Sequence, residues 1–328
     1  MTVAAGFPTT VNPIIQYGAI PVFIDTEIGT YVPEPEIIKN AISNKTKAIF
    51  LAHTLGNPFR AKEIREIADE FGLWLVEDNC DALGSTYLSK KTGTFGHLST
   101  LSFYPAHQIT TGEGGAILTD HPLLYKIAFS FRNWGRDCWC PPGKDNTCGK
   151  RFKWKMGKLP YGYDHKYIYS ECGFNLKMTD MQAAIGVAQM KKLDSFVRIR
   201  KENFAYLKKR FIEENLDEYF ILPQATSNSD PCWFGFPLTL KGDYSRTRLL
   251  ELLDKSGVST RLIFGGNLIR QPYFVEYEVP YKIVGTLKNT DKVMEKSFWI
   301  GLYPALKKDN LEYAISEIKK ALKIITRV

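Results

Sequence analysis

Four cysteines are spaced so that they could surround one metal centre. They are Cys80, Cys138, Cys140 and Cys148, in the pattern C-x57-C-x-C-x7-C. The first residues do not read as a secretory leader, so the pattern favours a metal or cluster site over disulfides. Ligand chemistry alone favours zinc and an iron–sulfur cluster about equally. The other two cysteines, Cys172 and Cys232, are predicted to be small buried side chains.

A carboxylate and an imidazole each follow a strand-like segment. Asp78 ends the segment 73–78, and His107 follows the segment 100–104, which contains Ser102. Isolated residues of these types are more often turn, cap or other structural residues. An acid here could instead keep a heteroaromatic nitrogen protonated, and a histidine could move protons near neutral pH. If the strand continued past Asp78, Cys80 would share its face, with the two α-carbons roughly 6–7 Å apart.

Composition narrows the class of protein. With 328 residues, the chain can bury a large core, and one large plus one smaller domain is the natural expectation. No apolar run is long enough to span a membrane, which predicts a cytoplasmic protein. The net charge of +8 comes from lysines spread over helical faces without a recognition motif, so we expect no nucleic-acid partner. A modest basic excess suits a substrate that carries phosphates.

Short apolar runs alternate with helical patterns along the chain. Strands are expected at 20–25, 48–53, 73–78, 100–104, 116–119, 233–240 and 258–263, and helices at 61–71, 178–214, 245–255 and 310–325. This alternation predicts an α/β fold with a mostly parallel sheet, whose ligands lie beyond the carboxyl ends of its strands. We expect a large domain at 1–190 and a linking helix with a small α/β domain at 191–328. The segment 136–171 has no clear period and is predicted to be a functional loop anchored by its cysteines.

Together these motifs resemble the DegT-type sugar aminotransferase family, vitamin B6 enzymes of the type I aminotransferase fold. The resemblance covers nearly the whole chain and rests on Gly56-Asn57-Pro58, Glu77-Asp78, Ser102 to Gly115, Gly173-Phe174-Asn175 and Asp180 to Ala184. It implies that Asp78 pairs with the pyridine nitrogen of the cofactor and that Ser102 binds its phosphate. It also implies that Asn175 reaches a cofactor phosphate, usually across the interface of a homodimer.

One departure from the family decides the expected chemistry. The resemblance places the cofactor-bearing lysine of the family at position 107, where this chain has His107. Imidazole is not a primary amine, so the cofactor cannot be tethered covalently and is expected as pyridoxamine 5′-phosphate (PMP). His107 can still act as an acid or base. Asp81, which replaces the His or Gln common in the aminotransferases, and the nearby Tyr104 are expected to tune elimination against amino transfer.

A histidine at this position resembles the 3-dehydrases of nucleotide-linked 4-keto-6-deoxyhexoses. The GDP-4-keto-6-deoxymannose group shares the histidine but lacks a cluster, whereas the CDP-4-keto-6-deoxyglucose group carries a 2Fe–2S cluster on cysteines with the spacing found here. The resemblance therefore implies a CDP-linked substrate, a 2Fe–2S cluster and a separate NAD(P)H-dependent iron–sulfur/flavin reductase. In the C-terminal part it points to Arg261, Asn267 and Arg270 as substrate-binding candidates.

The chain is also expected to lack an N-terminal segment that relatives carry, with a loop whose amides cradle the cofactor phosphate. A second class of function follows from this expectation. The chain could be a non-catalytic remnant with a structural metal loop, and absorbance bands of a cofactor and a cluster would distinguish the enzyme from such a remnant.

Overall fold

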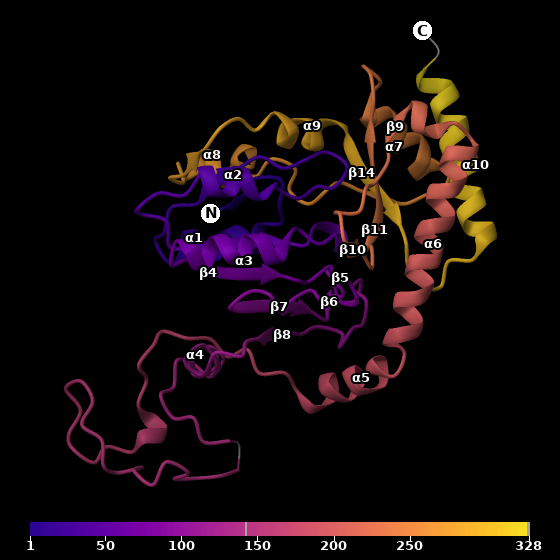
Figure 1. The fold of residues 1–328 in the computed structure, drawn as a ribbon. Coiled ribbons are helices and arrows are strands. Elements are labelled where there is room, and N and C mark those ends of the chain that lie inside the picture. Colours follow the sequence, from indigo (N-terminus) through magenta and orange to yellow (C-terminus); the bar gives the residue numbers. More distant parts are fainter. Residues whose placement is uncertain (142, 327–328) are drawn as a thin grey trace.

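A four-stranded sheet forms the centre of the large part of the molecule. The computed structural model describes residues 1–141 and 143–326. The sheet has the order β3-β4-β7-β8 and comprises β3 (Ala48–Ala52), β4 (Trp74–Asp78), β7 (Leu98–Ser102) and β8 (Gly115–Leu118). The first three strands are parallel and β8 is antiparallel (Figure 1). The carboxyl ends of β4 and β7 therefore lie at the same edge.

A second, parallel sheet continues this layer. It has the order β1-β2-β13, with β1 (Thr2–Val3), β2 (Val22–Ile24) and β13 (Lys282–Ile283). The Met1 amino group donates to the Ala48 carbonyl at 2.8 Å, which joins β1 to β3. The helices of this part are α1 (Pro8–Gln16), α2 (Pro35–Asn40), α3 (Ala61–Glu70), α4 (Pro122–Arg132) and α8 (Pro272–Glu276).

The C-terminal part is built on an antiparallel sheet of order β12-β14-β11-β9. Its strands are β9 (Phe220–Ile221), β11 (Gly235–Leu240), β12 (Thr260–Arg261) and β14 (Ser297–Gly301), and its helices are α6 (Leu193–Glu213), α7 (Arg246–Lys255), α9 (Lys288–Lys296) and α10 (Lys308–Ile325). All six residues of β11 are buried, and its apolar side chains form a core with those of α6, α7 and α10. Such a continuous apolar run is typical of a strand covered on both faces.

The remaining elements are short or peripheral. They are β5 (Thr86–Tyr87), β6 (Lys90–Lys91), β10 (Ser229–Asp230), α5 (Asp180–Met190) and the 3₁₀ turns Thr54–Gly56, His165–Tyr167, Leu216–Glu218 and Leu268–Arg270. None of the helices among the described residues is long and apolar enough to span a membrane.

The α/β class and the predicted strands and helices are confirmed, with ends that differ by a few residues. The predicted helical region 178–214 is two helices, α5 and α6. The division at residue 190 stays a prediction. Strand β13 pairs with β2, and the core around Phe23 includes Phe274 and Leu287, so residues from the C-terminal half pack into the first half.

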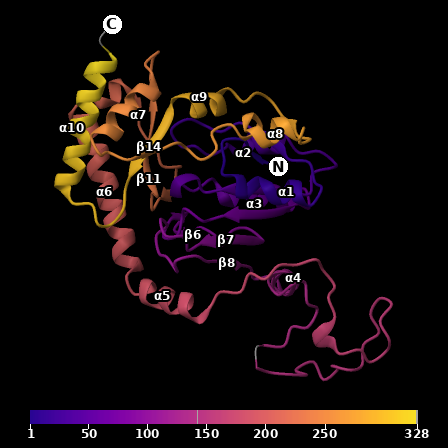
Figure 2. The ribbon, with the colours of Figure 1, turned by 180° about the vertical axis from the view of Figure 1, so that it is seen from behind.

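The segment 136–171 forms an arm that projects from the body beyond α4 (Figures 1 and 2). Its only regular element among the described residues is the 3₁₀ turn His165–Tyr167. This agrees with the predicted loop without a clear period.

A buried carboxylate fixes the loop that packs beside β4. Glu77 is fully buried, and it accepts hydrogen bonds from the amides of Gly93 (2.9 Å) and Phe95 (2.7 Å) and from His53 Nε2 (2.9 Å). Burial opposes ionisation, but the hydrogen bonds from His53 and the backbone outweigh it and hold the pKa of Glu77 below its usual value. Since alternate side chains of a strand face opposite ways, Glu77 braces the sheet while Asp78 faces the other side.

We expect Glu77→Gln to lower the free energy of unfolding by ~3–5 kcal/mol, because an amide cannot accept all of these hydrogen bonds. Urea denaturation at pH 7 measures the loss, with the exposed Glu66→Gln as a matched control. A lowered carboxylate pKa stabilises the fold above the ordinary pKa near 4.3, so the difference should shrink as the pH falls below about 4. A loss below ~1 kcal/mol would contradict this role.

Candidate active site

Asp78 lies at the carboxyl end of β4 and is held by three neighbours. Its Oδ2 accepts a 2.7 Å hydrogen bond from the Thr10 hydroxyl of α1. Its Oδ1 accepts from the Cys80 amide at 3.2 Å and, more weakly, from the Thr100 hydroxyl at 3.4 Å. These contacts fix the carboxylate at the strand edge where α/β sheets bind ligands.

The imidazole of His107 lies beside a second carboxyl group. Its Nδ1 is 3.5 Å from Asp81 Oδ1, and both side chains are 13% exposed. This separation is too long for a good hydrogen bond, and Nδ1 has no hydrogen-bond partner among the described residues. The two groups therefore form a largely buried pair in which the imidazole has unused bonding capacity.

The pKa values of both groups are shifted in the direction that favours their uncharged forms. Burial, together with the negative charge of Asp78, raises the pKa of Asp81 to about 7. Burial lowers the pKa of His107 to about 4; the charge of Asp78 opposes this shift and that of Arg200 adds to it. His107 is consequently a neutral imidazole at pH 7, able to accept a proton.

Arg200 of α6 supports the turn that carries His107. Its side chain is buried, and its guanidinium donates to the carbonyls of Leu302 (2.8 Å), Phe234 (3.0 Å) and, at the long distance of 3.5 Å, Ala106. The Phe234 ring lies 5.1 Å from the imidazole, centroid to centroid, and 5.7 Å from the guanidinium carbon. Arg200 therefore contacts both the Ala106 backbone next to His107 and the Phe234 ring that packs on the imidazole.

We expect Arg200→Met to raise the pKa of His107 toward its ordinary value, because a nearby positive charge is lost. Arg200→Lys keeps the charge and should keep the low pKa, although a misplaced imidazole can still lower kcat by up to ~10²-fold. NMR titration of histidine-labelled protein measures the pKa directly, with His107→Gln assigning the signal. The acid limb of the pH–rate profile should move to higher pH in the methionine variant only; an unchanged imidazole pKa there would contradict the charge effect.

The other predicted site residues lie on three different elements. Ser102 ends β7, with its hydroxyl accepting from the Tyr104 amide at 3.2 Å, and Tyr104 is exposed. Asn175 pairs with Asn133 in an isolated β-bridge at the base of the arm. The structure thus gathers Asp78, Asp81 and His107, while the roles of Ser102, Tyr104 and Asn175 stay predictions.

The four cysteines do not form a metal site within one chain. Cys80 lies beside Asp78 with its sulfur 3.5 Å from the Thr100 hydroxyl, whereas the other three are on the projecting arm. Within residues 1–141 and 143–326, no three His, Cys, Asp or Glu side chains are grouped so that they could hold a metal ion. The strand also ends at Asp78, so Cys80 reaches it through a tight turn and not along a continued strand face.

Two of the three candidate substrate residues are joined through one carboxylate. Asp291 accepts hydrogen bonds from Asn267 (2.8 Å) and from Arg270 (2.9 and 2.8 Å). Asn267 and Arg270 line a hollow of about 210 Å³, and Arg261 donates to the carbonyl of Thr260 instead. Substrate binding by these residues stays a prediction.

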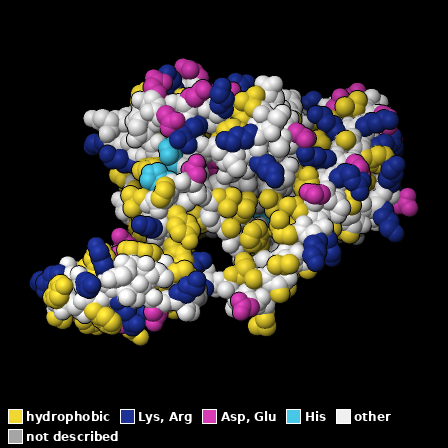
Figure 3. Space-filling view, turned by 60° about the horizontal axis from the view of Figure 1, so that its bottom comes forward, with side chains coloured by type: hydrophobic (Ala, Val, Ile, Leu, Met, Phe, Trp, Pro, Cys, Tyr) yellow, Lys and Arg dark blue, Asp and Glu magenta, His cyan; other side chains and the backbone are white. Residues whose placement is uncertain are grey.

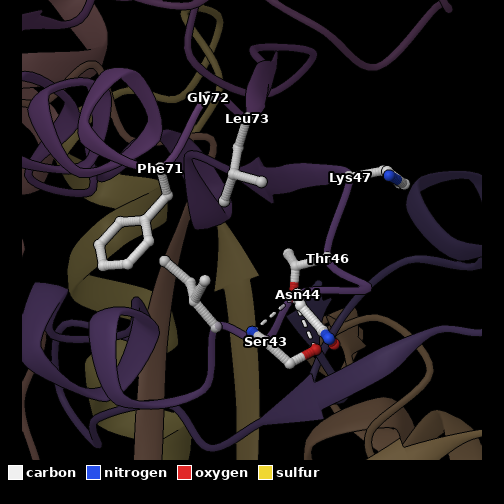
Figure 4. A pocket seen from close by; sticks show the side chains of 8 residues that line it. Ser43, Asn44, Thr46, Lys47, Phe71, Gly72 and Leu73 are labelled. Atoms are coloured by element: carbon white, nitrogen blue, oxygen red, sulfur yellow. Dashed lines mark hydrogen bonds between the residues drawn. The ribbon is translucent and has the colours of Figure 1, made fainter.

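A larger pocket lies at the opposite end of the strands. It has a volume of about 400 Å³, and its lining includes Ser43, Lys47 and Phe71 (Figure 4). Lys47 and Leu73 directly precede β3 and β4, so the pocket is at the amino ends of these strands. Since open α/β sheets bind ligands at the carboxyl ends, this pocket is not the candidate active site.

Thr10 and Arg200 were not identified from the sequence. Thr10 lies in the first turn of α1, and nothing in the sequence around it indicates a role in a site. Arg200 lies in a charged helical stretch typical of a solvated face. Both act over long sequence separations, 68 residues to Asp78 and 94 residues to Ala106. No local pattern signals such contacts.

Comparison with known proteins assigns the chain to a family. Residues 1–319 match the DegT/DnrJ/EryC1/StrS aminotransferase family, and the chain belongs to it. The resemblance seen in the sequence is thereby confirmed.

Three relatives illustrate its similarities. It is 56% identical over 98% of its length to the lipopolysaccharide biosynthesis protein RfbH of Salmonella typhimurium, covering 73% of that protein. It is 51% identical over 97% of its length to the dTDP-4-dehydro-2,6-dideoxy-D-glucose 3-dehydratase of Saccharopolyspora spinosa, covering 68% of it. Its fold matches E. coli GDP-4-keto-6-deoxy-D-mannose-3-dehydratase with bound hydrated PLP at a TM-score of 0.83 and 29% identity, covering 97% of this chain and 79% of that one.

Proposed function

We propose that this chain is a PMP-dependent sugar-nucleotide 3-dehydratase, acting as a CDP-4-keto-6-deoxyglucose 3-dehydrase in the synthesis of 3,6-dideoxyhexoses for lipopolysaccharide O-antigen. The observation that carries the proposal is the neutral, amine-free His107 beside Asp81, in a site that also contains Asp78. The reaction class is supported by similarity to proteins named as 3-dehydratases and as a lipopolysaccharide biosynthesis protein.

The described residues fit a B6 cofactor. Asp78 presents a fixed carboxylate suited to a protonated pyridine nitrogen, and Ser102 ends the neighbouring strand with a hydroxyl. The buried Nδ1 of His107 has no partner among residues 1–141 and 143–326, so it can bond to a bound molecule. Asn175 is proposed to reach a cofactor phosphate of the other subunit in a homodimer.

When bound, PMP would supply a primary amine that reacts with the 4-keto carbon of the sugar. Its ring would accept electrons from the cofactor's own C4′ carbon. Asp78 keeps the ring nitrogen protonated by a charge-assisted hydrogen bond. His107, neutral at pH 7, would accept a proton from the C4′ position of bound PMP and would give it to the departing C3 hydroxyl. Asp81 and the exposed Tyr104 are proposed to favour loss of the hydroxyl over amino transfer.

The proposal includes a 2Fe–2S cluster on the four cysteines and a separate NAD(P)H-dependent reductase. Net removal of the C3 oxygen requires electrons from outside the sugar, and the sequence has no flavin or nicotinamide fingerprint. The cysteines of one chain do not fit a cluster as they lie among the described residues. Zinc on the same thiolates is the alternative, and iron and sulfide analysis after anaerobic purification distinguishes them.

The nucleotide carrier has two further candidates. The 51% identity to a dTDP-sugar dehydratase favours testing dTDP, and the fold match to a GDP-sugar dehydratase favours testing GDP. A non-catalytic protein with a structural metal loop is the alternative of a different class, and it predicts no turnover of any of the three.

The test compares CDP-, dTDP- and GDP-linked 4-keto-6-deoxyhexoses with PMP-loaded protein and a chemical or enzymatic reductant. We expect turnover with the highest kcat/KM for the CDP-linked sugar. A preference for another nucleotide would refute the CDP assignment but not the reaction class. No consumption of any sugar by protein that binds PMP would refute the reaction class.

A further inference from the structure

The thiols of the proposed cluster are divided between two parts of the molecule. Cys80 lies at the carboxyl end of β4 beside Asp78, and Cys138, Cys140 and Cys148 lie on the arm 136–171. The arm projects from the body in both ribbon views (Figures 1 and 2). Three of the four thiols are therefore on the arm, and the fourth is at the edge of the sheet.

The arm has a small core of its own and is not a slack loop. His165 is buried, its Nε2 lies 2.6 Å from Asp137 Oδ2, and its ring packs against Trp139 and Trp154 at centroid distances of 5.3 and 5.1 Å. Arg151 binds Asp164 with two hydrogen bonds of 2.9 and 2.6 Å. Such a bidentate pair and a packed histidine hold the cysteine-bearing segments of the arm in one shape.

The neck of the arm is closed by backbone contacts. Asn133 pairs with Asn175 and Arg136 with Tyr169 in isolated bridges, and the Trp134 amide donates to the Phe174 carbonyl at 2.7 Å. Gly135 packs so closely that a Cβ on it would lie 1.8 Å from the Glu171 carbonyl oxygen. Swinging the arm onto the Cys80 of the same chain would break these contacts.

Apolar side chains lie open beside the arm. Neither α4 nor α5 buries a single residue, although α5 is mostly apolar. Leu123 and Tyr125 of α4 and Met181 and Val187 of α5 are each at least 59% exposed. The space-filling view shows a hollow between arm and body, with hydrophobic side chains gathered on the body side (Figure 3). Large contiguous apolar surfaces of this kind mark interfaces.

We propose that a second copy of this chain fills this hollow and that the four-cysteine site is completed between the two copies. Cys80 of one copy would meet the arm cysteines of the other. A two-fold axis makes the exchange reciprocal, so each dimer has two such sites. This inference rests on the homodimer of the proposed function, and it explains why the thiols of one chain do not meet.

The test uses two chains with different tags, each keeping one thiol of the set. The first carries Cys80→Ser, Cys138→Ser and Cys148→Ser and keeps Cys140; the second carries Cys138→Ser, Cys140→Ser and Cys148→Ser and keeps Cys80. Both carry Cys172→Ser, because Cys172 is exposed and would react. The prediction that Cys172 is buried was wrong, whereas Cys232 is buried as predicted. The chains are co-expressed, and diamide takes up the two electrons released when a disulfide forms.

We expect a disulfide between the differently tagged chains, seen as a heterodimer on a non-reducing gel and mapped to Cys80 and Cys140 by peptide mass analysis. A companion variant keeps both thiols in one chain and is co-expressed with an excess of chain lacking both. The inference predicts that this dilution strongly lowers its cross-linking. A disulfide within one chain, no disulfide in either experiment, or a monomer in sedimentation would overturn it.

Iron analysis of the unmodified protein separates this inference from the proposed function. Cross-linked heterodimers from a protein without iron would leave the shared site standing and refute the cluster. Iron and sulfide in a protein that forms no inter-chain disulfide would support the cluster and refute its division between copies. Circular dichroism of each serine variant shows whether it is folded before oxidation.

Discussion

Replacing His107 with glutamine is expected to lower the rate of dehydration by ~10²–10⁴-fold, the usual contribution of a general acid–base residue. Glutamine preserves polarity and approximate size but cannot take up a proton. The buried setting of His107 makes rescue by solvent inefficient. Single-turnover kinetics with PMP-loaded protein measure the effect, and cofactor affinity should change little.

The companion substitution His107→Lys tests the same position by adding the ability to attach the cofactor covalently. It introduces a primary amine, so pyridoxal phosphate should become covalently attached and fixable with borohydride. The unmodified protein should bind the cofactor without such attachment. Covalent trapping on the unmodified chain would show that another lysine performs this task and that the assignment of position 107 is wrong.

Asp78→Asn is expected to reduce dehydration by ~10²–10³-fold, similar to the loss of one preorganised electrostatic partner elsewhere. The asparagine side chain can still accept the hydrogen bond from the Thr10 hydroxyl, but it has no negative charge to pair with a protonated ring nitrogen. Removing this charge should also lower the pKa of Asp81, because Asp78 helps to raise it. A pH–rate profile and cofactor titration of the same protein measure both effects.

The control for Asp78 is Thr10→Val, which removes the hydroxyl that donates to the carboxylate at 2.7 Å. A hydrogen bond to a charged group contributes about 1.5–3 kcal/mol, and part of this loss should appear in kcat. The effect should therefore be smaller than that of Asp78→Asn. An equal loss in both variants, or full activity of Asp78→Asn, would contradict the pairing of this carboxylate with the ring.

Periodic patterns predicted the elements that carry the site. The apolar run before Asp78 and the segment before His107 are strands β4 and β7, and parallel pairing places their ends together. The fold class and the placement of Asp78 near His107 could therefore be expected from sequence. These features depend on local patterning and on a general rule of sheet topology.

Other features depend on which distant surfaces meet. The buried Arg200 comes from a helix whose charge pattern resembles a solvated face, and only packing against the C-terminal sheet shows its contacts. The cysteine spacing suggested one centre within a chain, but spacing does not specify which way a long arm points. The closed neck directs it outward, a tertiary contact that local propensity does not encode.

The most direct test of the proposed chemistry is the identity of the sugar formed by PMP-loaded protein from a nucleotide-linked 4-keto-6-deoxyhexose. We predict a product that has lost the C3 oxygen once electrons are supplied, as shown by mass spectrometry and by NMR of the C3 protons. A 4-amino sugar that keeps its C3 hydroxyl, formed as the cofactor is converted to pyridoxal phosphate, would contradict the account.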